Sequence, residues 1–211
     1  MNKARYKRVC HLVRELNKSR HVQEKKIDIL CNDMVSAHGD FIKRLKPLVF
    51  GVSFYESILG CNDLSSLLDA ASKMIGSAVD ESNVAVFLLD GDSFQLHITD
   101  GRHPIQIDAA SLESCFNTQV VKNISRSGRI CRLEEMFEMG LTGNLEDFNK
   151  ISAAALPLNR FGRVYGFVLI YRAADNELTA DELAKVAAIT PGLCNAIGAA
   201  AQSINSANTA H

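Results

Sequence analysis

Two histidines and two cysteines in the middle of the sequence have the side chains best suited to chemistry. His97, His103, Cys115 and Cys131 could together hold a metal ion or a haem. Their spacing matches no metal-binding motif, so a surface role for each histidine is the simpler interpretation. Cys115 and Cys131 could instead form a redox pair if the fold brought their sulfur atoms together. The sequence leaves this thiol alternative open.

Three arginines form a second group of candidate residues. Arg102, Arg129 and Arg132 lie in the middle part of the sequence. A guanidinium group matches the geometry of carboxylate and phosphate, so these side chains could hold an anionic ligand. For any one of them a solvated surface charge is the alternative.

The common catalytic motifs are absent. The sequence contains no phosphate-binding GxxxxGK[ST], no GxSxG and no HExxH, and no pair of carboxylates stands out for acid–base catalysis. The six cysteines show no CxxC spacing, so in a reducing compartment we expect free thiols. These features favour a binding or regulatory protein over an enzyme.

A predicted β-hairpin over residues 151–173 must help to position these side chains. Both of its strands are apolar at nearly every position, which predicts that both faces are covered. Gly162 supplies the conformational freedom of the turn. Pro157 lacks an N–H group, so we expect it where its edge is unpaired.

The first 46 residues form a basic segment with a helical pattern. They carry 12 Lys and Arg against 5 Asp and Glu, whereas the rest of the chain carries 11 against 19. Apolar residues recur in steps of four and three, which predicts a coiled-coil seam. The seam contains Val9, Val13, Leu16, Arg20, Gln23, Ile27, Leu30, Met34, Ala37 and Phe41.

After Phe41 the step changes to Leu45, which is a stutter in the heptad pattern. We expect a break near Pro47, because proline is best tolerated in the first turn of a new helix. The alternative to self-association is a single amphipathic helix packed on its own domain. A basic helix can also bind nucleic acid, but the interspersed acids favour a solvated coiled-coil exterior.

The remaining pattern predicts an α+β fold, with an antiparallel sheet flanked by helices. We expect helices over 63–79, 111–128 and from Thr179 onward, and strands over 83–90, 93–100, 105–108 and 129–133. Thr179 and Glu182 form a capping box. No run approaches 18 apolar residues and no secretory signal is present, so we expect a cytoplasmic protein without a membrane span.

The C-terminal third resembles the GAF domain, a small-molecule sensor fold related to PAS. The resemblance rests on the stretch SAAALPLNRFGRVYGFVLIYRAADNELTADELAKVAAI and on the helix 63–79 followed by NVAVFLLD. It implies a GAF-like domain at 60–203. The heptad pattern predicts a helical dimerisation arm at 1–59, and residues 204–211 show no packing signal and are expected to form a flexible tail. A helical arm before a GAF domain without an output domain also resembles an uncharacterised bacterial family of that layout.

The resemblance implies a ligand pocket above one face of the central hairpin. Small side chains there would leave volume for a ligand, whereas bulky neighbours could fill the same space. The candidate pocket residues are His97, Arg102, His103, Cys115, Phe116, Arg129, Ala153, Ala155 and Tyr165.

The sequence departs from the better-known GAF types. The NKFDE-type motif of cyclic-nucleotide-binding domains is absent. Bilin-binding domains carry a chromophore cysteine often followed by histidine, whereas Phe116 follows Cys115, so we expect no covalent bilin. The ligand, the cofactor and any metal stay unassigned.

The resemblance therefore implies a signalling protein that senses a small molecule and relays it to a separate effector. We expect a homodimer formed by the N-terminal helix and by the small-residue run near Gly198 in the C-terminal helix. A ligand-free adaptor and a thiol-based redox protein are the alternatives.

Overall fold

The computed structural model describes residues 3–61, 63–99, 109–143 and 148–208. The chain divides into two compact units, Met1–Leu48 and Val49–His211. The predicted strand 105–108 and the candidate residues Arg102 and His103 lie outside the described residues.

The first unit consists of helix α1, which runs over Lys3–Leu59 and ends within the second unit. The expected break near Pro47 is not formed, because Pro47 lies inside this helix. Proline removes one backbone hydrogen bond, which the carbonyl of the exposed residue Lys43 can make with water instead. The stutter and the proline therefore leave the helix uninterrupted.

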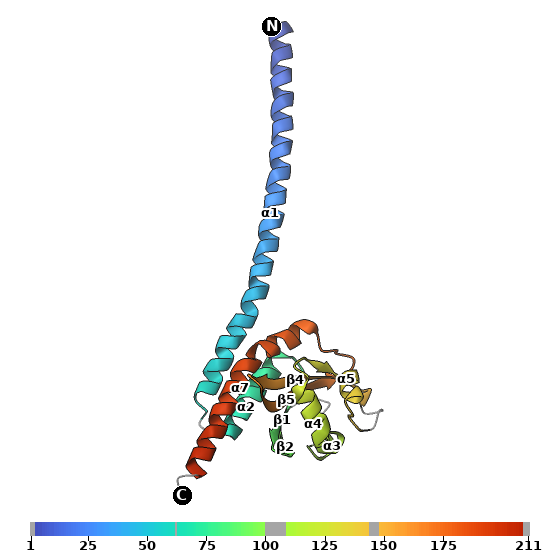
Figure 1. The fold of residues 1–211 in the computed structure, drawn as a ribbon. Helices are drawn as coiled ribbons and strands as arrows, with labels where there is room; N and C mark the ends of the chain where they lie inside the picture. Colours follow the sequence, from blue (N-terminus) through green and yellow to red (C-terminus); the bar gives the residue numbers. More distant parts are fainter. Residues whose placement is uncertain (1–2, 62, 100–108, 144–147, 209–211) are drawn as a thin grey trace. The chain divides into compact units, whose positions relative to one another are not determined.

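The second unit is a five-stranded antiparallel sheet with helices on both faces (Figure 1). The strand order is β2-β1-β5-β4-β3, so the predicted hairpin of β4 and β5 includes the central strand. Its strands are β1 (Asn83–Asp90), β2 (Ser93–Ile98), β3 (Cys131–Arg132), β4 (Ile151–Arg160) and β5 (Arg163–Ala173). Its helices are α2 (Leu64–Ala78), α3 (Ala109–Cys115), α4 (Thr118–Arg126), α5 (Leu133–Glu138) and α7 (Ala180–Asn208).

Two hydrophobic cores lie on the two faces of the sheet, which explains why the hairpin is apolar on both sides. The first core joins the sheet to α2, α7 and the end of α1. The second core joins the sheet to α3, α4 and α5. The sequence places the start of the domain at residue 60, whereas Phe54 and Ile58 of α1 already belong to the first core.

Side-chain caps mark the starts of three helices. Asp63 caps α2 by accepting a hydrogen bond from the backbone N–H of Ser66 (2.8 Å). Thr179 and Glu182 form the predicted capping box of α7. The single helix expected over 111–128 is instead two, because Asn117 accepts a hydrogen bond from the Val120 N–H and starts α4.

A buried arginine fastens the start of α7 to the sheet. Arg172 of β5 is 3% exposed and donates two hydrogen bonds to the Glu182 carboxylate, at 3.0 and 2.8 Å. Its other donors reach the carbonyl oxygens of Asp80, Asn176 and Glu177. A buried charge needs such complete pairing, since an unpaired one costs several kcal/mol.

Helix α7 is continuous through Pro191 and extends to Asn208, beyond the expected domain end at residue 203. Among the described residues it is the one helix whose length and composition would allow it to cross a membrane, over Ala180–Gln202. Its apolar side chains, such as Val186 and Ile189, are buried in the first core. The apolar character of α7 is therefore explained by packing.

Candidate functional site

The structure brings four of the predicted pocket residues together on one face of the sheet. Phe116, Ala153 and Ala155 are buried in the second core, and Cys115 packs against it. The remaining described candidates, His97, Arg129 and Tyr165, lie elsewhere.

Aromatic rings occupy the second core beside the small side chains. Phe87 stacks on Phe167 with ring centroids 4.6 Å apart, and Phe116 lies 4.7 Å from Phe87. All three rings are at most 1% exposed. Ala153 and Ala155 belong to the same buried cluster as these rings.

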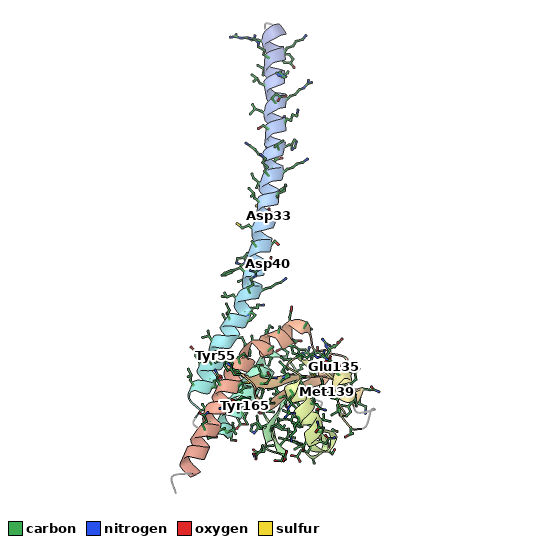
Figure 2. The ribbon with its side chains drawn as sticks, in the orientation of Figure 1. Asp33, Asp40, Tyr55, Glu135, Met139 and Tyr165 are labelled. Carbon is green, nitrogen blue, oxygen red and sulfur yellow. The ribbon has the colours of Figure 1, made fainter. Side chains whose placement is uncertain are left out.

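His97 and Tyr165 lie on the opposite face. The Nε2 atom of His97 is 2.9 Å from Oδ1 of Asp69 on α2, so this histidine ties β2 to the helical layer. Tyr165 packs against the first core, and its hydroxyl lies close to Gly198 of α7 (Figure 2).

A β-bulge explains the position of Tyr165. The pairing of β4 with β5 shifts between Leu158, opposite Gly166, and Asn159, opposite Val164. The extra residue is Tyr165, and an extra residue reverses the face to which a side chain points. Strict alternation along β5 therefore assigns Tyr165 to the wrong face.

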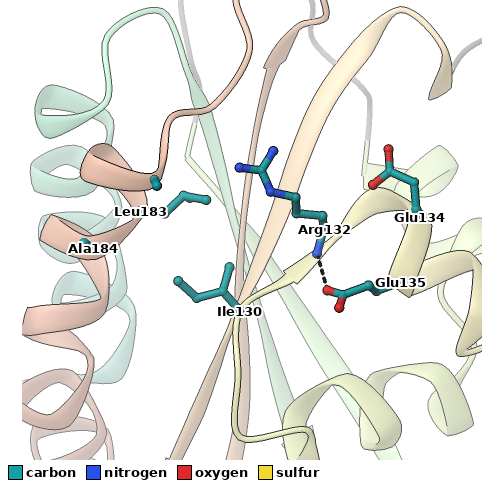
Figure 3. A pocket seen from close by; sticks show the side chains of 7 residues that line it. Ile130, Arg132, Glu134, Glu135, Leu183 and Ala184 are labelled. Carbon is teal, nitrogen blue, oxygen red and sulfur yellow. Dashed lines mark hydrogen bonds between the residues drawn. The ribbon is translucent and has the colours of Figure 1, made fainter.

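An apolar groove lies between α7 and the segment around β3, and we call it the Ile130 groove (Figure 3). Its volume is about 430 Å³, within the range of small-molecule sites. It is lined by Ile130, Arg132, Glu134, Glu135, Ala180, Leu183 and Ala184.

A smaller cavity of about 240 Å³ adjoins the groove and shares Ile130 with it. Arg129 lines this cavity, as do Pro157 of β4 and Pro191 of α7. The β3 strand pairs only with Ala154 and Ala155, so no described strand lies beside Pro157 on that edge, as its missing N–H predicts. The Ile130 groove and this cavity together follow about three turns of α7.

Charged residues that line the groove form ion pairs. Nη1 of Arg132 lies 2.9 Å from Oε1 of Glu177, while Arg129 pairs with Glu135 at 2.6 Å. The backbone N–H of Arg132 also donates to Oε2 of Glu135, at 3.0 Å. A ligand with an anionic group would compete with Glu177 for the half-exposed Arg132 guanidinium.

This arrangement of an apolar surface beside an arginine is suited to binding a small molecule. No group of three His, Cys, Asp or Glu among them could hold a metal ion. The six cysteines are free thiols, and Cys131 is completely buried. The Cys131 thiol lies 3.2 Å from the Ser127 hydroxyl and is enclosed in the second core.

Sequence reasoning missed most of the Ile130 groove. It identified Arg129 and Arg132 as candidate anion-binding residues, but it gave Ala180, Leu183 and Ala184 of α7 no role in a site. The helical spacing of Ala180, Ala184 and Ala187 was the one available signal, because small residues on a helix leave space beside it.

Beyond the smaller cavity, α7 contacts the end of α1. Gly192 follows Pro191, and a Cβ atom at Gly192 would overlap the ring of Tyr55 of α1. Figure 2 labels Tyr55 where α1 passes α7. One stretch of α7 therefore contacts both the groove and the end of α1.

Comparison with solved structures identifies the architecture. The GAF domain of a phosphoenolpyruvate-protein phosphotransferase from Coxiella burnetii is similar, with a TM-score of 0.56 and 12% identity over 75% of this chain and 96% of that one. The corresponding domain from Acinetobacter gives 0.55, with 15% identity over 76% and 98%. A GAF domain/HD domain protein from Geobacter sulfurreducens gives 0.50, with 18% identity over 66% and 95%.

No protein-family model and no curated protein matches the sequence. Identities of this size support a common fold and leave function to be argued from the site. The five-stranded antiparallel sheet and the helices on its two faces therefore have a GAF-like fold.

Proposed function

We propose that this protein is a dimeric regulatory protein whose GAF-like domain binds a small amphipathic molecule and passes the signal to a separate partner. One observation carries the proposal. Helix α7 forms a wall of the Ile130 groove and of the adjoining cavity, as far as Pro191. The residue after Pro191 is Gly192, which contacts Tyr55 of α1. Binding in the groove could therefore displace α1, the helix that carries the proposed dimer seam.

The lining of the groove supports a ligand with an apolar body and a carboxylate. Ile130, Leu183 and Ala184 offer an apolar surface of the size of a short alkyl chain. Arg132 stands at its edge, half exposed, with a guanidinium that already binds a carboxylate of Glu177. A ligand carboxylate would replace Glu177 without leaving the cation unpaired.

The relay would act through two arrangements of the helices. A ligand shifts such an equilibrium only if it binds one arrangement more tightly than the other. Insertion between Ile130 and Leu183 would separate α7 from the β3 segment, and the packing of Tyr55 on Gly192 would pass this displacement to α1. The dimer, formed by α1 with help from α7, would present the change to the effector.

The first test combines native mass spectrometry with titration. We expect the purified protein to be a dimer, and any retained ligand to appear as added mass. Octanoate is a suitable probe, because it joins an apolar chain to a carboxylate. Calorimetric titration of the full chain with octanoate should show saturable binding.

Two phenylalanine substitutions on α7 locate the site. Ala184→Phe fills the groove and should weaken octanoate binding at least tenfold. Ala188→Phe adds the same ring at an exposed position of the same helix and should leave binding unchanged. Equal binding by both variants would contradict the groove as the site, and a protein that binds no octanoate would contradict the proposed ligand class.

A ligand-free adaptor is a second candidate, favoured by a specific observation. The rings of Phe87, Phe116 and Phe167 pack closely on the face where the resemblance implied a pocket. A GAF-like domain with aromatic rings on this face could serve as a rigid scaffold, with the long helix binding another protein. A dimer without added mass and without a thermal shift across nucleotides, amino acids and fatty acids would favour this candidate.

A further inference from the structure

The seam of α1 is an apolar face without a partner in the described part of the chain. Its large apolar side chains are between 49% and 71% exposed; they are Val9, Val13, Leu16, Ile27, Leu30, Met34 and Phe41. A helix that packs against nothing is marginally stable in water, because most helical stability comes from burying an apolar face. The seam therefore calls for a partner helix.

We propose that this partner is the same helix of a second copy, aligned parallel and in register. The proposal rests on the dimer of the proposed function and adds its orientation, which the heptad pattern alone leaves open. Together with the e and g positions that flank it, the seam offers about 20 residues from each copy. A stable interface that buries about 1,600 Å² in total uses a similar number of residues on each side.

The residue types of the seam favour this arrangement. In heptad notation Val13 and Ile27 occupy two of the five a positions, while Leu16 and Leu30 occupy two of the five d positions. β-branched residues at a with leucine at d are the combination preferred by parallel two-stranded coiled coils, because each side chain then fits the hole that faces it.

The length of the seam decides against the antiparallel alternative. An antiparallel pairing centred between Arg20 and Gln23 would set Leu16 against Ile27. This pairing would end at about residue 41, because residue 41 lies opposite the start of the partner chain. Steps of three and four lead from Leu45 to Leu48, Val52, Tyr55 and Leu59. Tyr55 packs against Gly192 of α7, whereas Leu48, Val52 and Leu59 are 67%, 58% and 81% exposed. Parallel pairing covers these residues as well, because each one meets its own copy.

Charges beside the seam agree with the parallel register. Asp33, labelled in Figure 2, occupies a g position, and His38 occupies the e position five residues later. Parallel chains bring g of one helix against this e position of the other, so Asp33 would face the partner's His38. In the antiparallel register Asp33 would instead face the partner's Leu12.

The polar seam residues would fix the register. In the parallel dimer Gln23 meets the partner's Gln23, and two amides can exchange hydrogen bonds. Arg20 is held by Glu24 of its own helix, with Nε 3.0 Å from Oε1, which offsets the repulsion between the two arginines. A shift by one heptad would place Arg20 against Val13 or Ile27, where a charge would be buried against apolar groups.

Cysteine cross-linking of the full-length protein tests the orientation. Cys10, Cys31 and Cys61 are first replaced by serine, and this parent is checked for dimers by native mass spectrometry. Leu16→Cys should then form a disulfide-linked dimer rapidly under mild oxidation, because residues at d face one another in a parallel pair. Lys18→Cys, on the outer face of the same turn, should cross-link at least tenfold more slowly.

A mixture of Leu16→Cys and Ile27→Cys proteins covers the antiparallel outcome. Parallel pairing predicts only homodimeric cross-links, whereas predominant cross-links between the two variants would overturn the proposed orientation. A parent that is dimeric but cross-links at neither seam position would place the interface elsewhere and also overturn it. A monomeric parent would instead contradict the dimer of the proposed function.

Discussion

The ring of Tyr55 in α1 occupies the space that a side chain at position 192 of α7 would need. Gly192 is therefore required for close packing between the two helices, and its substitution should separate them. Tyr165 makes a similar contact with Gly198, where a Cβ atom would lie 2.7 Å from the tyrosine hydroxyl. Two glycines of α7 therefore each pack against a tyrosine, one from α1 and one from β5.

Gly192→Ala should lower the free energy of unfolding by about 1–3 kcal/mol, because the added methyl group collides with the Tyr55 ring. Urea denaturation measures this change. Gly51→Ala is the matched control, since nothing lies within 4 Å of its Cβ position in α1, and there alanine should stabilise by about 0.5–1 kcal/mol. In the background of Tyr55→Ala the cost of Gly192→Ala should largely disappear; an unchanged cost would contradict the contact.

Gly166→Ala should be one of the most damaging single substitutions in the sheet. Gly166 has a φ of +144°, and a Cβ atom there would overlap the carbonyl oxygen of Phe87 on the neighbouring strand. We expect a loss of about 3 kcal/mol or more in stability, measured by thermal unfolding. Gly91→Ala, in an open turn at φ +59°, should cost only about 1 kcal/mol. Similar costs at both positions would show that crowding at β1 is unimportant.

Glu182→Gln should lower stability in a pH-dependent manner. Partial burial alone would raise the pKa of Glu182, but hydrogen bonds from Thr179 and Arg172 outweigh it and hold the pKa below its ordinary value. A carboxyl with a lower pKa in the folded state stabilises the protein above its unfolded pKa, and this contribution is lost as pH falls through the folded pKa. We expect a cost of about 2–4 kcal/mol at pH 7 that shrinks below about pH 4.

Urea unfolding of both proteins at pH 7, 5 and 3.5 measures this difference. Glu177→Gln is the control, because its ion pair with Arg132 is largely exposed and should contribute less than about 1 kcal/mol. A cost for Glu182→Gln that is equal at pH 7 and pH 3.5 would rule out the carboxylate as its source.

The cysteines should differ widely in reactivity. Burial raises the pKa of the Cys194 thiol to about 11, and Cys131 is also fully buried, whereas Cys31 is exposed. Because the thiolate is the reactive form, N-ethylmaleimide at pH 7.5 should label Cys31 at least a hundredfold faster than Cys131 or Cys194. Peptide mass spectrometry after timed quenching measures the rates, with urea-unfolded protein as the control. Rapid labelling of Cys131 in the folded protein would revive the thiol-based alternative.

Local features of the sequence were sufficient for much of the fold. The doubly apolar hairpin predicted a strand pair covered on both faces, and Thr179 with Glu182 predicted the start of α7, because capping and alternation depend on residues a few positions apart. Asn117 was overlooked as a cap, so one predicted helix is really two. Pro47 was given too much weight, since an exposed helix can lose one hydrogen bond to water and continue.

The candidate site shows where sequence reasoning stops. Ala153 and Ala155 were correctly placed on one face, yet the bulge beside Leu158 moved Tyr165 to the other face, and a bulge depends on how two strands pair. The Ile130 groove joins residues from β3, α5 and the start of α7, which are up to about 50 positions apart in the chain. The sequence by itself determined the elements and the faces they bury, because those follow from short-range periodicity. Only the tertiary structure decided which elements meet at the groove and that Tyr55 lies against Gly192, because such contacts depend on how complete helices and strands pack together.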